Sequence, residues 1–350
     1  LVAPAMAGAG GQFYIIISAM AQLLVAIMAQ RSGTFINKQT SPSPAAAISR
    51  TISVNHSGRG DFKHIQQAID SIPDGNSEWI RIHVAAGTYR EKVHIKSNKP
   101  FIVLEGEGRD RTAMEWPDHY YRSFNRVPTF ESATFRCDAS DFQARNITFK
   151  NTYTIDNNTV PAVAAQVSGD RSAFYNCGFV GVQDTLNDQQ GRHYYENCYL
   201  EGAVDFIFGH ARSIFQGCTL WTCKLPSWKY QGFLTAQGRV LLSEDNGFVF
   251  KECTVDGVTP VYLGRGWRFC STVIFYRTFL SNIIVPQGWD AWNAKGHETS
   301  LTMLESECTG PGSNRTGRVP WSRVASGTEV ARFTDINYVS SDGWLGAQPH

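Results

Sequence analysis

Two aspartates near the middle of the chain have a spacing that would let them act together. Asp184 and Asp205 are 21 residues apart, and each lies seven residues after a cysteine, Cys177 or Cys198. When two carboxyl groups are neighbours, the pKa of one rises, so near neutral pH one is an acid while the other is a nucleophile or base. A lone aspartate is more often a turn residue. The shared interval and the apolar flank Phe206-Ile207-Phe208 favour the chemical interpretation here.

Three further side chains are candidates for the same site. Gln183 precedes Asp184, and at a strand end or bend its amide would donate to a developing oxyanion; the competing interpretation is a solvent-facing glutamine. Arg265 would hold a carboxylate in its ionised form through a bidentate contact. Trp267 would stack on a sugar face, although an Arg-x-Trp pair alone is more often a surface pair.

The segments that would position these residues recur at an interval typical of a stacked β solenoid. A four-residue unit that begins with an aromatic residue and in most cases ends in cysteine starts at Phe149, Phe174, Tyr195, Phe215, Phe250 and Phe275. Successive units are 25, 21, 20, 35 and 25 residues apart, with short β-type runs between them. Equivalent positions on successive coils of a parallel stack lie about 4.8 Å apart. Asp184 and Asp205 would therefore be neighbours on one face.

The same interval suggests roles for residues of other types. Cys177, Cys198 and Cys218 would stack in the core as thiols; the spacing also allows a disulfide, and a nucleophilic role is the least supported. An asparagine ladder at a turn is predicted from Asn151, Asn176 and Asn197. The histidines His193, His210 and His297 are not at metal-ligand spacings and are interpreted as structural or surface residues.

Length and charge limit the classes of protein. The 350 residues carry a net charge of +1, which gives no argument for binding nucleic acid or an anionic membrane. Residues 1–50 differ from the rest: the apolar run 13–29 predicts a secretory segment, with a membrane anchor as the competing interpretation, and a Ser-Pro-rich linker follows. The folded domain is expected at residues 51–350. Glycosylation sequons begin at Asn55, Asn146, Asn157 and Asn314 and weakly favour secretion.

The two ends of the folded region have their own patterns. Apolar residues from Phe62 to Ile72 fall at helical spacing, with Asp61 as the expected N-cap and Pro73 as the stop. This helix would cover one open end of the solenoid. The tail from Gly288 to His350 is expected to pack outside the coils as loops and short helices.

With these motifs the sequence resembles the plant pectin methylesterases, a family of carbohydrate esterases, from about Thr51 to the end of the chain. The resemblance lies in Gly87-Thr88-Tyr89-Arg90-Glu91, Thr129-Phe130-Glu131-Ser132-Ala133-Thr134, Gln183-Asp184-Thr185-Leu186, Asp205-Phe206-Ile207-Phe208-Gly209 and Leu263-Gly264-Arg265-Gly266-Trp267. It implies a right-handed parallel β-helix, so the expected fold class is all-β. Residues 1–50 are too short for the inhibitor-like pro-region that many plant members carry.

The resemblance also implies roles. Asp205 would be the nucleophile that attacks a methyl ester of homogalacturonan, and Asp184 the acid that protonates methanol and then the base that activates water. Gln183 would stabilise the oxyanion, Arg265 would orient Asp205, and Trp267 and Thr129 would contact the polysaccharide. No metal or organic cofactor is implied. The expected protein is a secreted, extracellular cell-wall monomer whose partner is pectin, with a proteinaceous methylesterase inhibitor as a second candidate partner.

Two departures from the family pattern bear on this expectation. Pro161 stands where the family has a glutamine that contributes to the oxyanion site, and proline has no side-chain donor. Gln166, five positions further on, is expected to face the other way. Gly266 replaces a proline and would loosen the backbone between Arg265 and Trp267. Pro161 therefore leaves a catalytically weak or silent pectin-binding homologue as an alternative. Because a carboxylate pair about 5 Å apart would also suit a retaining glycosidase, a glycoside hydrolase or lyase that acts on the same polymer is a second alternative.

Overall fold

The structure is a computed structural model, and it describes residues 45–120, 128–153, 160–224 and 231–350. The chain divides into two units, and the described residues belong to the second, Pro44–His350. The apolar run 13–29, predicted as a secretory segment or anchor, lies outside the described residues. Within the described ranges, no helix is both long enough and apolar enough to span a membrane.

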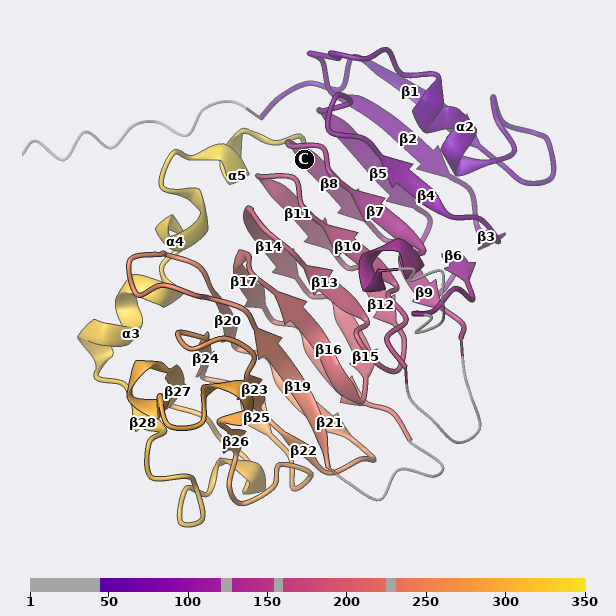
Figure 1. Cartoon of the computed structure of the whole chain (residues 1–350). Coiled ribbons are helices and arrows are strands. Elements are labelled where there is room, and N and C mark those ends of the chain that lie inside the picture. The colour runs from indigo at the N-terminus through magenta and orange to yellow at the C-terminus, as the bar shows by residue number, and fades with distance from the viewer. Residues whose placement is uncertain (1–44, 121–127, 154–159, 225–230) are drawn as a thin grey trace, which may run out of the picture. The chain divides into compact units, whose positions relative to one another are not determined.

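The described part winds into a parallel β-helix whose coils contribute strands to three sheets (Figure 1). Sheet A is 11-stranded in this part of the chain. Its strands, in spatial order, are β1 (Arg50–Val54), β2 (Ile80–Val84), β5 (Ile102–Gly106), β8 (Phe142–Arg145), β11 (Ser172–Tyr175), β14 (Arg192–Glu196), β17 (Arg212–Gln216), β20 (Gly247–Lys251), β24 (Thr272–Tyr276), β27 (Thr302–Ser306) and β28 (Arg323–Val324).

The other two sheets complete each coil, and their strands also pair in parallel. Sheet B comprises β3 (Gly87–Tyr89), β6 (Thr112–Trp116), β9 (Thr148–Asn151), β12 (Gly178–Val180), β15 (Tyr199–Gly202), β18 (Thr219–Thr222), β21 (Thr254–Gly257) and β25 (Phe279–Leu280). Sheet C comprises β4 (Val93–Ile95), β7 (Phe135–Cys137), β10 (Ala165–Val167), β13 (Leu186–Asp188), β16 (Val204–Gly209), β19 (Gly232–Gln237), β23 (Gly264–Gly266) and β26 (Trp289–Asp290), with β22 (Val261–Tyr262) beside β19.

The interior is built from columns of like residues, one from each coil. Phe174, Tyr195, Phe215, Phe250 and Phe275 pair in register along sheet A. Their successive ring centroids are 4.9, 4.4, 4.7 and 4.7 Å apart, and the rings are nearly parallel. The predicted aromatic repeat is confirmed for these five residues. Because each ring stacks on the next, the column fixes the register of the coils that carry Asp184 and Asp205.

A second column consists of the cysteines, which follow the aromatic residues at the turn between sheets A and B. Cys177, Cys198, Cys218 and Cys253 are buried, and all are free thiols. Burial raises the pKa of the Cys198 thiol well above its ordinary value, so it remains a proton donor, here to the Phe174 carbonyl at 3.5 Å. The expectation of stacked core thiols is confirmed.

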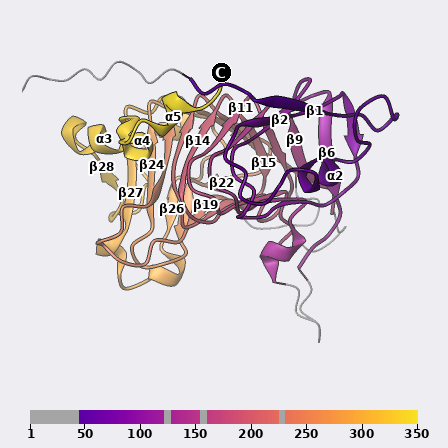
Figure 2. The same ribbon diagram turned by 90° about the horizontal axis from the view of Figure 1, so that it is seen from above.

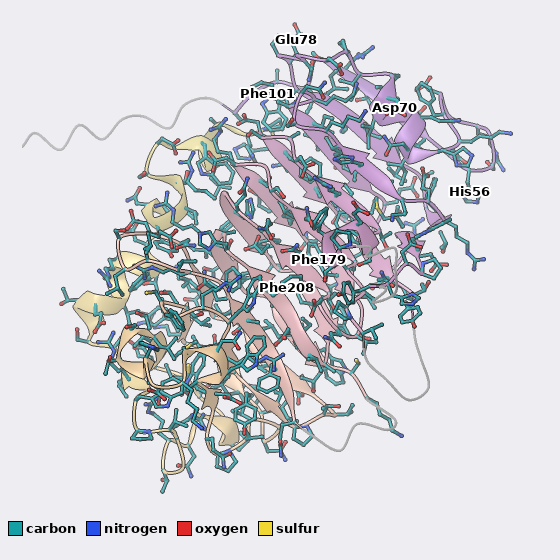
Figure 3. The ribbon with its side chains drawn as sticks, in the orientation of Figure 1. His56, Asp70, Glu78, Phe101, Phe179 and Phe208 are labelled. Atoms are coloured by element: carbon teal, nitrogen blue, oxygen red, sulfur yellow. The ribbon has the colours of Figure 1, made fainter. Side chains whose placement is uncertain are left out.

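The first unit of the predicted repeat was wrong. Phe149 belongs to sheet B and pairs with Phe179. Phe179 is labelled in Figure 3. Consequently Asn146, and not Asn151, is equivalent to Asn176 and Asn197; all three have a positive φ, of 54°, 52° and 53°. Asparagine tolerates this left-handed conformation better than most residues, which explains its recurrence at this turn.

The predicted N-terminal helix is α2 (Ile65–Asp70), and its N-cap is not Asp61 as predicted. The Asp61 carboxylate accepts from Ser53 instead. The first amides of α2, those of Ile65 and Gln66, donate to the two carboxylate oxygens of Glu91 at 2.8 and 3.0 Å. Glu91 ends the motif that begins at Gly87, so this family motif fixes the helix that closes one end of the coils.

The C-terminal helices cover the outer face of sheet A, as Figures 1 and 2 show. They are α3 (Gly327–Thr334), α4 (Asn337–Ser340) and α5 (Trp344–Ala347). Their apolar residues pack on Tyr194, Ile214, Val249 and Ile274. The tail also forms the single 3-10 turns Trp292–Ala294, Glu298–Ser300 and Pro311–Ser313 and adds β27 and β28 to sheet A. The expectation of loops and short helices alone was therefore incomplete.

Candidate active site

A cavity of about 450 Å³ lies over the middle of sheet C. All six residues that the sequence singles out contribute to its walls: Thr129, Gln183, Asp184, Asp205, Arg265 and Trp267. They come from four separate segments of the chain, which the coils bring together. The structure thus places the predicted residues in one site.

A β-bulge aims Asp205 into this cavity. Val204 pairs with Phe233 and Ile207 pairs with Thr235, so two residues of β16 face one residue of β19. Asp205 has a φ of 48°, which turns its carboxylate outward while Phe206 and Ile207 both enter the core. Of the apolar flank predicted to surround the aspartates, only Phe208, labelled in Figure 3, lines the cavity. A strained backbone of this kind is typical of functional positions.

Asp184 occupies the equivalent position in the preceding coil. Gln183 forms a parallel bridge with Val204, and the Asp184 amide donates to the Val204 carbonyl at 3.0 Å. Asp184 also has a positive φ, of 61°. The prediction that Asp184 and Asp205 are neighbours on one face is confirmed by this pairing.

Arg265 reaches Asp205 from β23, two strands further along sheet C. Its Nε donates to Asp205 Oδ1 at 2.8 Å, and its Nη2 donates to Oδ2. Burial raises the pKa of the Asp205 carboxyl, and the hydrogen bonds and charge of Arg265 oppose that rise. The pair therefore favours an ionised Asp205 in a site with little water, since only 7% of this residue is exposed.

The environment of Asp184 is different. Burial, followed by the charge of Asp205, raises the pKa of Asp184 well above its usual range, while Arg265 and a hydrogen bond from Gln183 lower it by less. Within the described residues, no arginine forms an ion pair with Asp184. The surroundings therefore favour the protonated form of Asp184 more strongly than that of Asp205.

Aromatic and polar side chains form the rest of the rim. Trp267 meets Phe208 edge to face, with ring centroids 6.1 Å apart. Thr129 begins the 3-10 helix Thr129–Ser132, whose Ser132 hydroxyl donates to the Thr129 carbonyl and accepts from the Val163 amide. These contacts place a flat ring at one side of the cavity and a short helix at another.

The two departures from the family pattern have specific surroundings. The Pro161 carbonyl accepts from the Tyr120 amide at 2.8 Å, and the next amide, that of Ala162, donates to the Gln183 carbonyl at 3.1 Å. Residue 161 therefore lies beside Gln183. Gly266, expected to loosen the backbone, is instead a regular strand residue paired with Gln237. A Cβ on Gly266 would lie only 2.7 Å from the Ala291 carbonyl oxygen, so glycine permits a close approach there.

Sequence reasoning missed several residues of the cavity. These are Phe130, Asn187, Gln189, Ala236 and Trp292. Asn187 lies three residues after Asp184, and its Nδ2 donates to Gln166 Oε1 at 3.1 Å, while its buried Oδ1 has no partner within the described residues. Gln166 is thus on the cavity side of sheet C, behind Asn187, and the expectation that it faces away was wrong. The outward alternation of β13 would have identified Asn187; no sequence signal pointed to Trp292.

The predicted structural role of His193 is clear in the structure. Its Nδ1 meets Asp188 Oδ1 at 2.6 Å and its Nε2 meets the Gly169 carbonyl at 3.0 Å, with no exposed surface on either side chain. Tyr195 and Ser213 donate to the same carboxylate. In the described ranges, no group of three or more His, Cys, Asp or Glu side chains is placed to hold a metal ion.

Comparison with known proteins places this site in a family. The family model described as Pectinesterase matches residues 51–342. Probable pectinesterase 29 of Arabidopsis thaliana is 43% identical over 315 residues, which cover 87% of this chain and 92% of that protein. Putative pectinesterase 10 of the same plant is 45% identical over 313 residues, covering 87% and 89%.

Solved structures agree. The pectin methylesterase from carrot has a TM-score of 0.80 and 31% identity, covering 87% of this chain and 97% of the carrot chain. The deglycosylated pectin methylesterase from Aspergillus niger has a TM-score of 0.74 and 28% identity, covering 88% and 99%. The expected right-handed parallel β-helix is confirmed by this match together with the parallel sheets. The chain belongs to the pectinesterase family.

Proposed function

We propose that this protein hydrolyses the methyl esters of pectin, a homogalacturonan, to give de-esterified pectate and methanol. The observation that carries the proposal is the pair of unlike carboxyl groups in one cavity: Asp205 is bound by Arg265, whereas the described residues provide no such partner for Asp184. Family membership makes an ester of pectin the substrate class. We assign residues 51–350 as the catalytic domain and residues 1–50 as a targeting segment and linker.

Asp205 is the nucleophile in this proposal. Its carboxylate oxygen attacks the ester carbonyl carbon, and the carbonyl oxygen becomes an oxyanion. Because Arg265 occupies both carboxylate oxygens along one edge, their remaining lone pairs are available to the substrate. Gln183, which lines the cavity beside Asp184, donates to the oxyanion.

Asp184 supplies and then recovers a proton. When the tetrahedral intermediate collapses, the bond to the methoxy oxygen breaks and the Asp184 proton leaves with methanol, which leaves an anhydride on Asp205. The Asp184 carboxylate then takes one proton from water while the water oxygen attacks the galacturonyl carbon, the bond from that carbon to the Asp205 oxygen breaks, and the uronic acid leaves and gives its remaining proton to the solvent. This second collapse restores ionised Asp205 and protonated Asp184.

The cavity walls bind the polymer. Trp267 offers its ring to a sugar face, and Thr129 lies across the cavity on its own short helix. Because pectin is a wall polysaccharide, we also propose that the protein is secreted and acts as a monomer in the cell wall. An inhibitor protein that covers the cavity is a further candidate partner.

The first experiment is methanol release from highly methylated pectin by the wild type and by Asp205→Asn. We expect turnover by the wild type and a loss of at least about 10³-fold in the variant, which keeps the shape of the side chain but not its nucleophilicity. A folded wild type that releases no methanol would contradict the proposal. New reducing ends and falling viscosity would instead indicate a glycoside hydrolase or lyase.

The silent pectin-binding alternative is not favoured. It rested on Pro161 alone, and the family match covers the whole described site. Its remaining prediction is galacturonan binding with no methanol from either wild type or Asp205→Asn, so the same experiment decides between the two functions.

A further inference from the structure

The guanidinium of Arg265 has an aromatic ring over each of its two faces. The central carbon Cζ lies 4.1 Å from the centroid of the Phe233 ring and 3.8 Å from that of the Trp292 ring. Two rings that are each this close to one carbon cannot share a face of a planar group, so they enclose it from opposite sides. Asp205 occupies the edge between them. Contacts this short are well within the range of a cation–π interaction.

Both rings are held by their own contacts. Phe233 lies in β19, beside Val204 of β16, and its ring stacks on Tyr262 with centroids 5.1 Å apart. The Trp292 amide donates to Asp290 Oδ1 at 2.8 Å, and Trp292 has a φ of 44°. Gly266 lets this segment approach β23, because a Cβ there would meet the Ala291 carbonyl. Glycine at position 266 therefore permits the close approach of the segment that carries Trp292.

Arg265 has a choice of carboxylates. Asp205 faces it from β16, Asp184 lies in the coil before, and Asp290 is its in-register neighbour on β26. A mobile guanidinium would divide its hydrogen bonds among these groups and water. A guanidinium confined between two rings has freedom only in its own plane, and in that plane it meets Asp205 with two parallel donors.

On the basis of the proposed function, we propose that Phe233 is a positioning residue for ester hydrolysis: with Trp292 it fixes Arg265 in the orientation that binds both carboxylate oxygens of Asp205. Phe233 is not among the described residues that line the cavity, whereas Trp292 is. A loss caused by changing Phe233 is therefore expected in kcat rather than in KM. Phe233 acts through Arg265, and Arg265 in turn favours the ionised form of Asp205.

The test compares Phe233→Leu with Phe233→Tyr, using methanol release from methylated pectin across a range of pH. We expect Phe233→Leu to lower kcat about tenfold with KM changed less than about twofold, as for loss of one desolvated cation–π contact. The acid limb of kcat/KM should move to higher pH. Burial raises the pKa of Asp205, and in this variant Arg265 would oppose that rise less effectively. Phe233→Tyr, which keeps the ring, should restore kcat and the acid limb.

The control is Phe279→Leu, which removes an exposed ring from β25 in sheet B and should leave kcat and the acid limb unchanged. Wild-type kcat and an unmoved acid limb in Phe233→Leu would overturn the inference, as would a folded Phe233→Tyr that is equally slow. If Phe233→Leu fails to fold, Trp292→Leu removes the exposed ring on the other face, and the same shift of the acid limb is required of it.

A readout independent of turnover separates this inference from the proposed function. The Nε–H of Arg265 should exchange slowly with solvent in the wild type and much faster in Phe233→Leu, as followed by NMR. If the wild type releases no methanol but this difference is present, the proposed function fails, while the inference that Phe233 and Trp292 hold Arg265 in place stands. If methanol is released and the exchange rates are equal, the inference about Phe233 fails alone.

Discussion

Arg265 and Asp205 are 60 residues apart in the sequence, yet Arg265 donates from Nε and Nη2 to the two carboxylate oxygens of Asp205. The two residues are close in space because Asp205 lies in β16 and Arg265 lies in β23, with only β19 between these strands in sheet C. Each coil moves the chain by one strand spacing, so residues from separate coils meet on a continuous surface. The chemistry proposed for Asp205 depends on this pairing, because burial alone would favour its protonated form.

Replacement of Arg265 by lysine should therefore be severe. Lysine keeps the charge but cannot donate in parallel to both oxygens or lie between two rings. We expect kcat/KM for methylated pectin to fall by about 10² to 10³ and its acid limb to move to higher pH. The matched control is Arg277→Lys, at an exposed pair with Glu307, which should be neutral. A variant with wild-type kcat/KM would show that Arg265 acts only through its charge.

Pro161→Gln tests the oxyanion site. Residue 161 lies beside Gln183, because the Ala162 amide donates to the Gln183 carbonyl. A glutamine there would add a donor to the oxyanion, and we expect kcat to rise by about tenfold, less than the full effect of a preorganised donor. Pro161→Ala, which changes the backbone but adds no donor, should not raise kcat. If Gln and Ala variants have the same kcat, the wild type already has its full set of oxyanion donors.

Glu91→Ala tests the interpretation of the motif that begins at Gly87. Glu91 accepts from the Ile65 and Gln66 amides, so its loss leaves the start of α2 without a cap. We expect the free energy of unfolding to fall by about 1 to 2 kcal/mol, as for other lost N-caps, with little change in kcat. The control is Glu78→Ala, at an exposed loop position labelled in Figure 3. Equal stabilities for the two variants would contradict the capping role.

The parts of the fold that could be predicted from sequence are those that repeat. The aromatic column and the cysteine column give the period directly, because each coil must present the same residue type to the same layer of the core. The same period placed Asp184 beside Asp205. It failed at Phe149, since an isolated aromatic residue does not reveal which of two sheets it belongs to.

The parts that could not be predicted depend on contacts between distant segments. The cap of α2 comes from Glu91 rather than from the neighbouring Asp61, so a local rule selected the wrong residue. Phe233 and Trp292 carry no motif, and only the completed coils bring them to the two faces of Arg265. The bulge at Asp205 was equally hidden, because a run of apolar residues does not reveal which of them faces the core.

Asp184→Asn should separate catalysis from stability. The amide cannot donate a proton to methanol or take one from water, so we expect kcat to fall by about 10² to 10⁴. The folded-state pKa of Asp184 is raised, first by burial and then by the charge of Asp205. A raised carboxyl pKa means that Asp184 contributes stability below its unfolded-state pKa and loses that contribution as pH rises through the folded-state value.

Because Asp184→Asn has no carboxyl group to ionise, its stability does not fall as the pH rises through the folded-state pKa of Asp184. At about pH 8 the free energy of unfolding of Asp184→Asn should exceed that of the wild type, and below about pH 4 the two should converge. Urea unfolding at several pH values measures the difference, with Asp110→Asn, at an exposed loop position, as the control that should show none. A slow variant that is also less stable at high pH would mean that Asp184 is ionised in the folded protein, and the acid proposed here would have to be another group.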